Sequence, residues 1–185
     1  MLEKYDYEIW NVDKLTYAGN RENLGGWKGH HNYNFIKADI NSEEIISDII
    51  EKNKIDVIIN FAAETHVDRS INSSDEFIQT NINGTHTLLK MFHKFPIKKF
   101  IQISTDEVYG ALTEDDKPFT EETPLAPNSP YSASKASADM LCRSFHETYG
   151  YPIVITRCSN NYGPNQYPEK LIPLMIQKAK NGEKL

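Results

Sequence analysis

An acidic pair and a tyrosine–lysine pair are the side chains of this 185-residue sequence best suited to proton chemistry. Asp106 and Glu107 follow the hydroxyl of Thr105, and Tyr131 and Lys135 stand four residues apart. A lysine ammonium near a phenol stabilises the phenolate, so the tyrosine could take a proton from a hydroxyl group during its oxidation. Two adjacent carboxylates can divide their protonation, one acting as an acid and the other as a base. The two pairs together predict an oxidation coupled to an elimination.

Each pair alone also has an ordinary interpretation. Adjacent carboxylates are commonly a solvated turn, and a tyrosine and a lysine at this spacing often occur by chance. On a helix, however, Tyr131 and Lys135 would share one face. Ser104 and Thr105 add hydroxyl groups at the end of the preceding predicted strand. The combination therefore favours a catalytic role.

Short β-rich runs alternate with helical or polar segments, which predicts a parallel sheet with crossover helices. The predicted strands cover residues 7–12, 33–38, 56–61, 99–104 and 153–158. The predicted helices cover residues 43–52, 75–93 and 131–149, and Gly150 is the expected C-terminal cap of the last. Nearly continuous apolar runs predict that the third and fourth strands are central. The proline-rich, acidic segment 111–130 is expected to be an ordered surface excursion.

The polar candidates follow the carboxyl ends of the predicted strands, the edge at which open parallel sheets bind ligands. Asp13 could accept hydrogen bonds from an adenosine ribose and would repel the extra phosphate of NADP, which favours NAD. Asp39 and Ile40 could flank the adenine, and the small Ala62 and Ala63 would allow close approach of a dinucleotide. Acidic and small residues also end strands as turn formers and helix caps.

The expected fold is α/β, a Rossmann-like doubly wound parallel sheet, with two departures. A dinucleotide fold is expected to open with a strand and a glycine-rich turn, whereas Gly25, Gly26 and Gly29 lie after Asp13. We therefore expect a portion of a longer enzyme that lacks the first strand, its Gly-rich loop and most of a C-terminal substrate domain. In the strand order 3-2-1-4-5-6 this leaves a gap between the strands ending at Asp13 and Phe61. Residues 1–165 are predicted to be a partial NAD-binding domain, and residues 166–185 the start of a substrate-binding region.

The composition narrows the classes of protein. A hydrophobic content of 39%, a charged content of 25% and a formal net charge of -6 fit a globular protein and make nucleic acid an improbable partner. The sequence has no apolar run of membrane-spanning length. Cys142 and Cys158 are expected to be reduced thiols of a cytoplasmic protein, and the scattered histidines predict no metal site.

Four motifs resemble a known family. They are Phe-Ala-Ala-Glu-Thr-His-Val-Asp-Arg-Ser (61–70), Ser-Thr-Asp-Glu-Val-Tyr-Gly (104–110), Pro-Tyr-Ser-Ala-Ser-Lys (130–135) and Thr-Arg-Cys-Ser-Asn-Asn-Tyr-Gly-Pro (156–164). They are similar to those of the dTDP-glucose 4,6-dehydratases, which are extended short-chain dehydrogenase/reductases. Related epimerases share Tyr-x-x-x-Lys but lack Asp-Glu after Ser-Thr. The resemblance implies NAD-dependent conversion of dTDP-glucose to dTDP-4-dehydro-6-deoxyglucose.

The resemblance also implies roles for individual residues. Asp106 would donate a proton to the C6 hydroxyl, Glu107 would be the C5 base, Tyr131 with Lys135 would serve hydride transfer, and Thr105 would bind the sugar. The implied NAD contacts are Asp13, Lys14, Leu15, Thr16, Asp39, Ile40, Phe61, Ala62, Ala63, Glu64, Thr65, Thr80, Tyr131, Lys135 and Asn161. The implied substrate contacts are Thr65, Thr105, Asn160, Lys170 and Leu171.

Family members are usually homodimers through the helices predicted at 75–93 and 131–149. Two alternatives to the dehydratase remain: another NAD-dependent nucleotide-sugar enzyme, an epimerase or decarboxylase, and a non-catalytic fragment or binding protein on the same scaffold.

Overall fold

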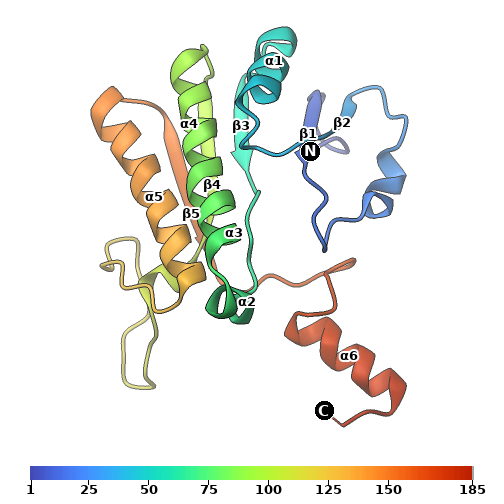
Figure 1. Cartoon of the computed structure of the whole chain (residues 1–185), viewed down its shortest axis with the longest axis vertical. Helices are drawn as coiled ribbons and strands as arrows, with labels where there is room; N and C mark the ends of the chain where they lie inside the picture. Colours follow the sequence, from blue (N-terminus) through green and yellow to red (C-terminus); the bar gives the residue numbers. More distant parts are fainter. Residues whose placement is uncertain (185) are drawn as a thin grey trace. The chain divides into compact units, whose positions relative to one another are not determined.

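Strands and helices alternate along residues 1–184, the part of the chain that this computed structural model describes (Figure 1). The strands are β1 (Ile9–Asp13), β2 (Tyr33–Lys37), β3 (Val57–Asn60), β4 (Lys99–Thr105) and β5 (Ile153–Cys158). The α-helices are α1 (Glu43–Asn53), α2 (Val67–Asn72), α3 (Asp75–Phe77), α4 (Thr85–Lys94), α5 (Pro130–Tyr149) and α6 (Leu171–Asn181). The 3₁₀ turns are η1 (Arg21–Trp27) and η3 (Asp106–Tyr109), and η2 (Ile78–Gly84) is a π-helix.

The predicted elements agree with this structure to within two residues at their ends. Gly150 caps α5 in the left-handed conformation, with a φ of 70°, as predicted. Segment 111–129 contains no helix or strand, so the predicted excursion ends one residue early, at Pro130, which begins α5. The sequence prediction missed α2, α6 and the two 3₁₀ turns.

The strands form two parallel sheets, β1-β2 and β3-β4-β5. No pairing joins β1 to β3 among the described strands, which is where the strand order predicted a gap. The prediction that β3 is central is wrong for this chain. β4 is its one partner strand, and Val57 at its start is 43% exposed because one edge of β3 pairs with no described strand.

The chain divides into two compact units. The first contains Met1–Lys37 and the segment from Asn160 onward, and the second contains Ala38–Ser159. Within the first unit, the Tyr17 hydroxyl donates to Glu169 at 2.7 Å, and the Tyr17 ring meets Tyr167 edge to face. These contacts join the loop after β1 to the segment before α6.

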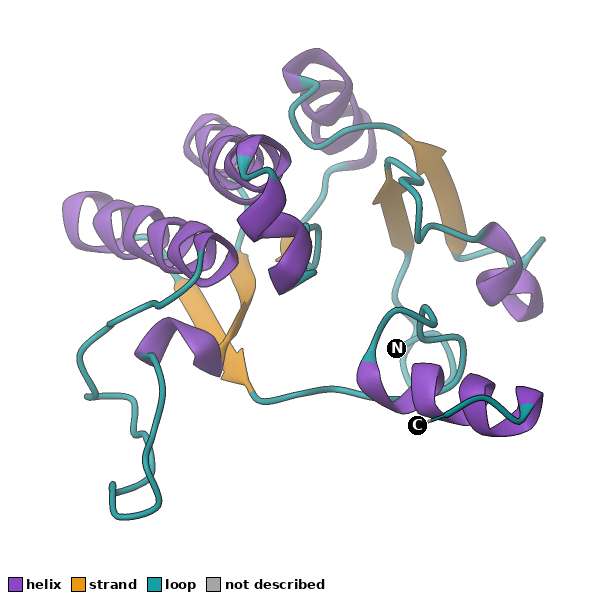
Figure 2. Cartoon of the chain, turned by 60° about the horizontal axis from the view of Figure 1, so that its bottom comes forward, coloured by secondary structure: helices purple, strands orange, loops and turns teal. Residues whose placement is uncertain are grey.

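In the second unit, α4 and α5 run side by side along one face of the β3-β4-β5 sheet (Figures 1 and 2). The side chains between these layers form the core. Phe100 on β4 and Leu89 on α4 are fully buried, as are Ala138 and Cys142 on α5. The two faces of β5 differ, because its side chains alternate between half-buried and exposed.

The predicted helix 75–93 is one continuous helix with a π-helical middle. The π segment η2 lies between α3 and α4 and contains buried Asn81, whose side chain bonds to the backbone of a neighbouring loop. Gly84 ends η2 where a Cβ atom would lie 2.4 Å from Cδ1 of Ile40. Glycine therefore lets this helix lie close to the turn after β2.

Across residues 1–184, no helix has the length and apolar character needed to cross a membrane. The same residues contain no cluster of three or more His, Cys, Asp and Glu side chains arranged to hold a metal ion.

Candidate active site

The acidic pair lies on a short turn that its flanking residues fix. Thr105 ends β4 and caps η3, its hydroxyl accepting a hydrogen bond of 3.3 Å from the Glu107 backbone N–H. Gly110 follows the turn with φ 101° and ψ -138°, a conformation that favours glycine. A Cβ atom there would lie 2.7 Å from the carbonyl oxygen of Ala126. The turn is thus held at both ends.

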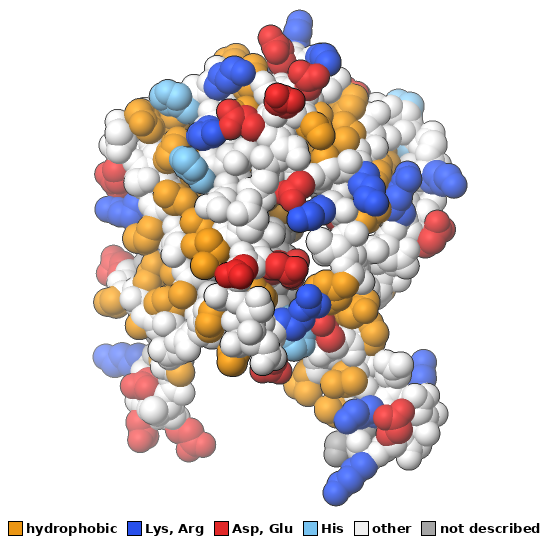
Figure 3. All heavy atoms as spheres, viewed as in Figure 1, with side chains coloured by type: hydrophobic (Ala, Val, Ile, Leu, Met, Phe, Trp, Pro, Cys, Tyr) orange, Lys and Arg blue, Asp and Glu red, His pale blue; other side chains and the backbone are white. Residues whose placement is uncertain are grey.

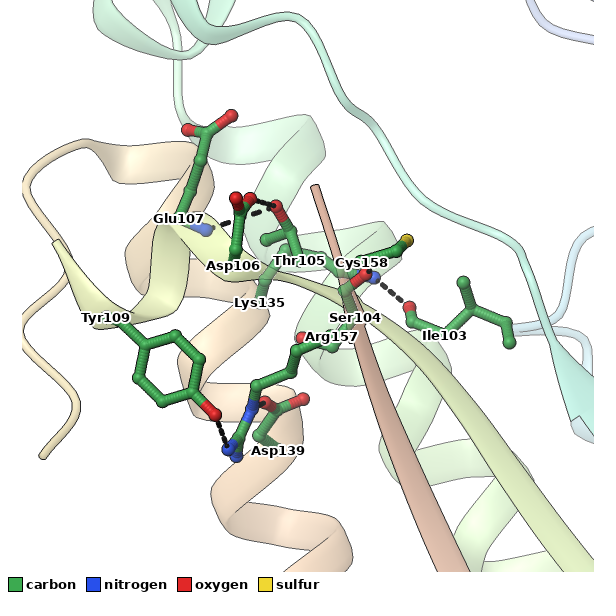
Figure 4. A network of polar contacts seen from close by, with 10 residues as sticks. All are labelled: Ile103, Ser104, Thr105, Asp106, Glu107, Tyr109, Lys135, Asp139, Arg157 and Cys158. Carbon is green, nitrogen blue, oxygen red and sulfur yellow. Dashed lines mark hydrogen bonds and ion pairs between the residues drawn. The ribbon is translucent and has the colours of Figure 1, made fainter. Parts of the chain in front are cut away.

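The two carboxylates of this turn point in different directions. The Asp106 carboxylate stays beside Thr105, whose hydroxyl donates to it at 3.3 Å, whereas Glu107 extends away from both (Figure 4). Successive residues of a 3₁₀ turn are about 120° apart, which accounts for the divergence. Both side chains are half-buried. The two carboxyl groups could therefore face two different atoms of a ligand.

Tyr131 and Lys135 lie in the first turns of α5. Ser129 caps this helix through a capping box with Ser132, and proline occupies the first helical position, so the start of the helix is sharply defined. The Tyr131 backbone N–H donates to the Ser70 hydroxyl at 3.1 Å, which ties the helix start to α2. Both predicted side chains are buried, Tyr131 being 7% and Lys135 4% exposed.

The protonation of Tyr131 is governed by burial and by the acidic turn. Burial raises the pKa of the phenol to about 12, and the negative charge of Glu107 adds to this effect. Hydrogen bonding by the Thr105 side chain acts in the opposite direction. Tyr131, Thr105 and Glu107 are therefore close enough for Thr105 and Glu107 to affect the pKa of the phenol.

Lys135 makes its hydrogen bond to the backbone in this structure, a contact that the sequence analysis did not foresee. Its ammonium donates to the carbonyl oxygen of Ile103 at 2.6 Å (Figure 4). Burial lowers the pKa of Lys135, and the carboxylate of Asp139 opposes that shift. A buried ammonium needs a hydrogen-bond acceptor, and β4 offers the carbonyl of Ile103. The remaining two N–H groups of the ammonium have no partner among the described residues.

Asp139 and Arg157 form a buried ion pair beside this site that the sequence analysis missed. Arg157 Nε donates to Asp139 Oδ2 at 2.9 Å, and Arg157 Nη1 donates to the Tyr109 hydroxyl at 2.9 Å. Burial raises the pKa of the Asp139 carboxyl, while the hydrogen bond and the positive charge of Arg157 oppose that shift. Asp139 stands four residues after Lys135, and that helical spacing was the one available sequence signal.

Asn81 is a second polar residue missed from the sequence. Its amide accepts from the Glu64 N–H at 2.9 Å and donates to the Glu64 carbonyl at 3.0 Å. It also donates to the Ser134 hydroxyl at 2.8 Å. Asn81 thereby joins the loop after β3 to α5. That loop contains the predicted cofactor residues 61–65, and α5 carries Tyr131. Thr80, a predicted NAD contact that precedes Asn81 in the sequence, is half-buried.

The other predicted cofactor residues of this unit lie at the carboxyl ends of β2 and β3. Asp39 Oδ1 accepts from the Asn41 backbone at 2.9 Å, so its carboxylate forms the turn before α1. Ile40 is buried at 8% exposure. In the loop after β3, Phe61 is 71% exposed and Thr65 is exposed, Ala62 and Ala63 are half-buried and Glu64 is buried.

The remaining predicted residues belong to the first unit. Asp13 ends β1 and accepts from the Leu15 N–H at 2.7 Å, and Leu15 has a positive φ of 54°. Lys14, Thr16 and Asn160 are exposed. The carbonyl of Asn161 accepts from Gln166 at 3.0 Å. Lys170 precedes α6, and Leu171, its first residue, is 70% exposed.

Comparison with known proteins identifies the family. The model of the GDP-mannose 4,6 dehydratase family matches residues 1–185. The chain belongs to this family. Its dehydratase relatives confirm the resemblance seen in the motifs, and the Rossmann-like α/β fold of the family is the fold class predicted from the sequence.

Three relatives illustrate the similarity. The low-salt glycan biosynthesis protein Agl12 of Haloferax volcanii is 51% identical over 185 residues, all of this chain and 58% of that protein. A dTDP-glucose 4,6-dehydratase of Xanthomonas campestris is 50% identical, with 96% of this chain and 53% of the relative covered. The crystal structure of dTDP-glucose 4,6-dehydratase from Bacillus anthracis in complex with NAD is 52% identical with a TM-score of 0.91, covering all of this chain and 57% of that one. The chain thus spans somewhat more than half the length of these relatives.

Proposed function

We propose that the protein, in its full-length form, is an NAD-dependent dehydratase that converts dTDP-glucose to dTDP-4-dehydro-6-deoxyglucose and water. One observation carries the proposal: the carboxylates of Asp106 and Glu107 diverge after β4 (Figure 4), and both raise the pKa of the buried phenol of Tyr131. An oxidoreductase needs the phenol alone, whereas removal of water across two carbons needs an acid and a base as well. Relatives at about 50% identity that are named dTDP-glucose 4,6-dehydratase support this choice.

The proposed elimination uses both carboxyl groups. Oxidation at C4 acidifies the C5 proton, which Glu107 removes. Asp106 gives a proton to the C6 hydroxyl, which leaves as water while a double bond forms between C5 and C6. Thr105, which already bonds to the Asp106 carboxylate, would hydrogen-bond the sugar. The divergence of the two carboxylates supports their action on two neighbouring carbon atoms.

The residues present fit NAD as the cofactor. Lys135 holds a buried ammonium with two unpaired N–H groups, a donor set suited to ribose hydroxyl groups. Half-buried alanines at 62 and 63 allow a close approach to the loop after β3. NAD, when bound, accepts hydrogen from C4 and returns it to C6, and its nicotinamide ring is positively charged.

Tyr131 is the proposed base for oxidation at C4. Its raised pKa means that it holds its proton at neutral pH in the absence of a nearby cation. A positive charge close to the phenol opposes the effect of the neighbouring carboxylates and lowers this pKa. The phenolate then takes the proton of the C4 hydroxyl, and this proton passes to solvent because C4 stays a ketone in the product. Glu107 returns its proton to C5 when the hydride is delivered to C6, and Asp106 regains a proton from solvent.

The proposed cofactor and substrate contacts of the first unit rest on the resemblance. Asp13 to Thr16 and Asn161 are proposed NAD contacts, and Asn160, Lys170 and Leu171 are proposed substrate contacts. Lys170 is suited to a diphosphate because it carries a mobile positive charge. The proposed domain division, residues 1–165 for NAD and 166–185 for substrate, follows the same resemblance.

The direct test is incubation of the full-length protein with dTDP-glucose. A 4-keto-6-deoxy product, detected by mass spectrometry as the loss of one water, is the expected result. Epimerisation at C4 without loss of water would refute the dehydratase and support a nucleotide-sugar epimerase. Absence of any conversion, in a protein that also fails to bind NAD, would support the non-catalytic alternative.

We also propose a homodimer through the exposed face of the helical pair α4 and α5. Hydrophobic side chains gather over these helices in Figure 3, and Met140 and Tyr149 of α5 are 46% and 49% exposed. Their apolar area supports a protein partner. Met140→Glu is expected to halve the mass measured by light scattering, and an unchanged dimer would refute this interface. The expected reduced state of Cys142 and Cys158 supports a cytoplasmic location.

A further inference from the structure

Arg157 on β5 contacts both the helix and the turn that carry the candidate catalytic groups. Its guanidinium donates to Asp139 on α5 and to the Tyr109 hydroxyl at the end of η3, both at 2.9 Å. Asp139 lies one helical turn after Lys135. Figure 4 shows the guanidinium bridging from the helix to the tyrosine. One side chain thus links the two elements.

Burial makes this link stronger than an ordinary surface ion pair. The Asp139 side chain is fully buried and that of Arg157 is 18% exposed. Charge-assisted hydrogen bonds are stronger than neutral ones, and water competes little for them in such a place. By contrast, the Lys52–Asp48 pair lies within α1 with both side chains more than half exposed. That pair lies within one helix, so it does not link two elements of the fold.

Tyr109 transmits the link to the acidic turn because its own position is fixed. Its ring lies 5.1 Å from that of Phe119, and it packs in a cluster with Val108 and Ala136. The Arg157 guanidinium carbon also lies 5.1 Å from the centre of the Tyr109 ring. Glu107 is two residues before Tyr109 in the same turn. A shift of the tyrosine therefore moves the carboxylates.

We propose that Arg157 is a positioning residue, which holds the acidic turn in register with α5 through its paired contacts to Tyr109 and Asp139. The kinetic part of this inference rests on the proposed dehydratase function, whereas the structural part concerns the fold alone. Oxidation requires Tyr131, but elimination requires the turn and the helix to face the same sugar. Loss of the link therefore slows elimination more than oxidation.

The first test measures the turn itself in the full-length protein. Tyr109→Phe removes the hydroxyl that accepts from Arg157 and keeps the packed ring. Backbone hydrogen exchange in residues 106–110 is expected to become roughly tenfold faster, the size expected for one lost hydrogen bond. Tyr33→Phe is the matched control, because the Tyr33 hydroxyl accepts a hydrogen bond of the same 2.9 Å length from Asn11. Unchanged exchange in residues 106–110 would overturn the proposal.

The second test separates the steps with dTDP-glucose and stopped-flow detection of NADH. In Tyr109→Phe, elimination is expected to slow roughly tenfold to a hundredfold while oxidation changes by less than about threefold, so NADH persists longer. Arg157→Lys should reproduce this pattern, because a lysine ammonium lacks the planar fork that spans two acceptors. Equal slowing of both steps would show a general structural role and contradict the proposal. A wild-type protein without dehydratase activity would refute the proposed function and leave the exchange result as the test of positioning.

Discussion

Glu107→Gln separates the two halves of the proposed reaction. Glutamine keeps the shape of the side chain, and the backbone N–H of residue 107 still donates to the Thr105 hydroxyl. Because the glutamate is half-buried and on a turn, the free energy of unfolding is expected to change by less than about 0.5 kcal/mol. Any larger loss of activity then reports on chemistry.

The expected loss falls on elimination. A positioned general base contributes roughly 10²- to 10⁴-fold, so the barrier to removal of the C5 proton rises by about 3–5.5 kcal/mol. Oxidation at C4 is spared, because the charge of Glu107 raises the pKa of Tyr131 and its removal favours the phenolate. The variant should therefore form NADH and stop.

Two measurements check this expectation on the full-length protein. Rapid mixing with dTDP-glucose should give an NADH signal that persists, and in heavy water the recovered sugar should keep its original C5 hydrogen. Glu121→Gln, in the exposed segment 111–130, is the control and should behave like the wild type. Product formation at the wild-type rate would refute the assignment of Glu107 as the base, and loss of NADH formation would refute the separation of roles.

Three further outcomes follow from the structure. Gly110→Ala should lower the free energy of unfolding by about 1–3 kcal/mol in chemical denaturation, because alanine is strained at a φ of 101°; an unchanged midpoint would count against the described turn. One thiol, Cys158, should react with an aromatic disulfide reagent in the native protein, because burial raises the pKa of Cys142 to about 12; two rapidly reacting thiols would contradict this. The phenol of Tyr131 should ionise near pH 12 without cofactor, since its pKa is raised, and at lower pH in Glu107→Gln; an ultraviolet titration in which the substitution raised that pKa would contradict the sign.

Local sequence patterns predicted all five strands and the longer helices α1, α4 and α5 of this fold. The β-rich runs matched the strands because their apolar residues are packed against helices, and the spacing of Tyr131 and Lys135 matched the start of α5. The pairing of the acidic turn with that helix could be predicted because both follow strands of one parallel sheet.

The features that sequence reasoning missed depend on contacts between distant residues. Arg157 meets Asp139 and Tyr109, which are 18 and 48 positions away in the chain. An arginine in a strand predicts a solvent-facing side chain, unless the residues that it contacts are known. The direction of the Lys135 ammonium was missed for the same reason, because a backbone carbonyl as acceptor leaves no mark in the sequence.

The π-helical segment η2 constrains how this chain can change in length. A π turn holds about one residue more than an α turn, so deleting one residue between 78 and 84 would allow ordinary α-helical winding and leave α4 facing the sheet as before. The cost of the deletion falls on Asn81, whose side chain is bonded to Glu64 and Ser134. The extra residue of η2 therefore serves the connection between the loop after β3 and α5, and not the continuity of the helix.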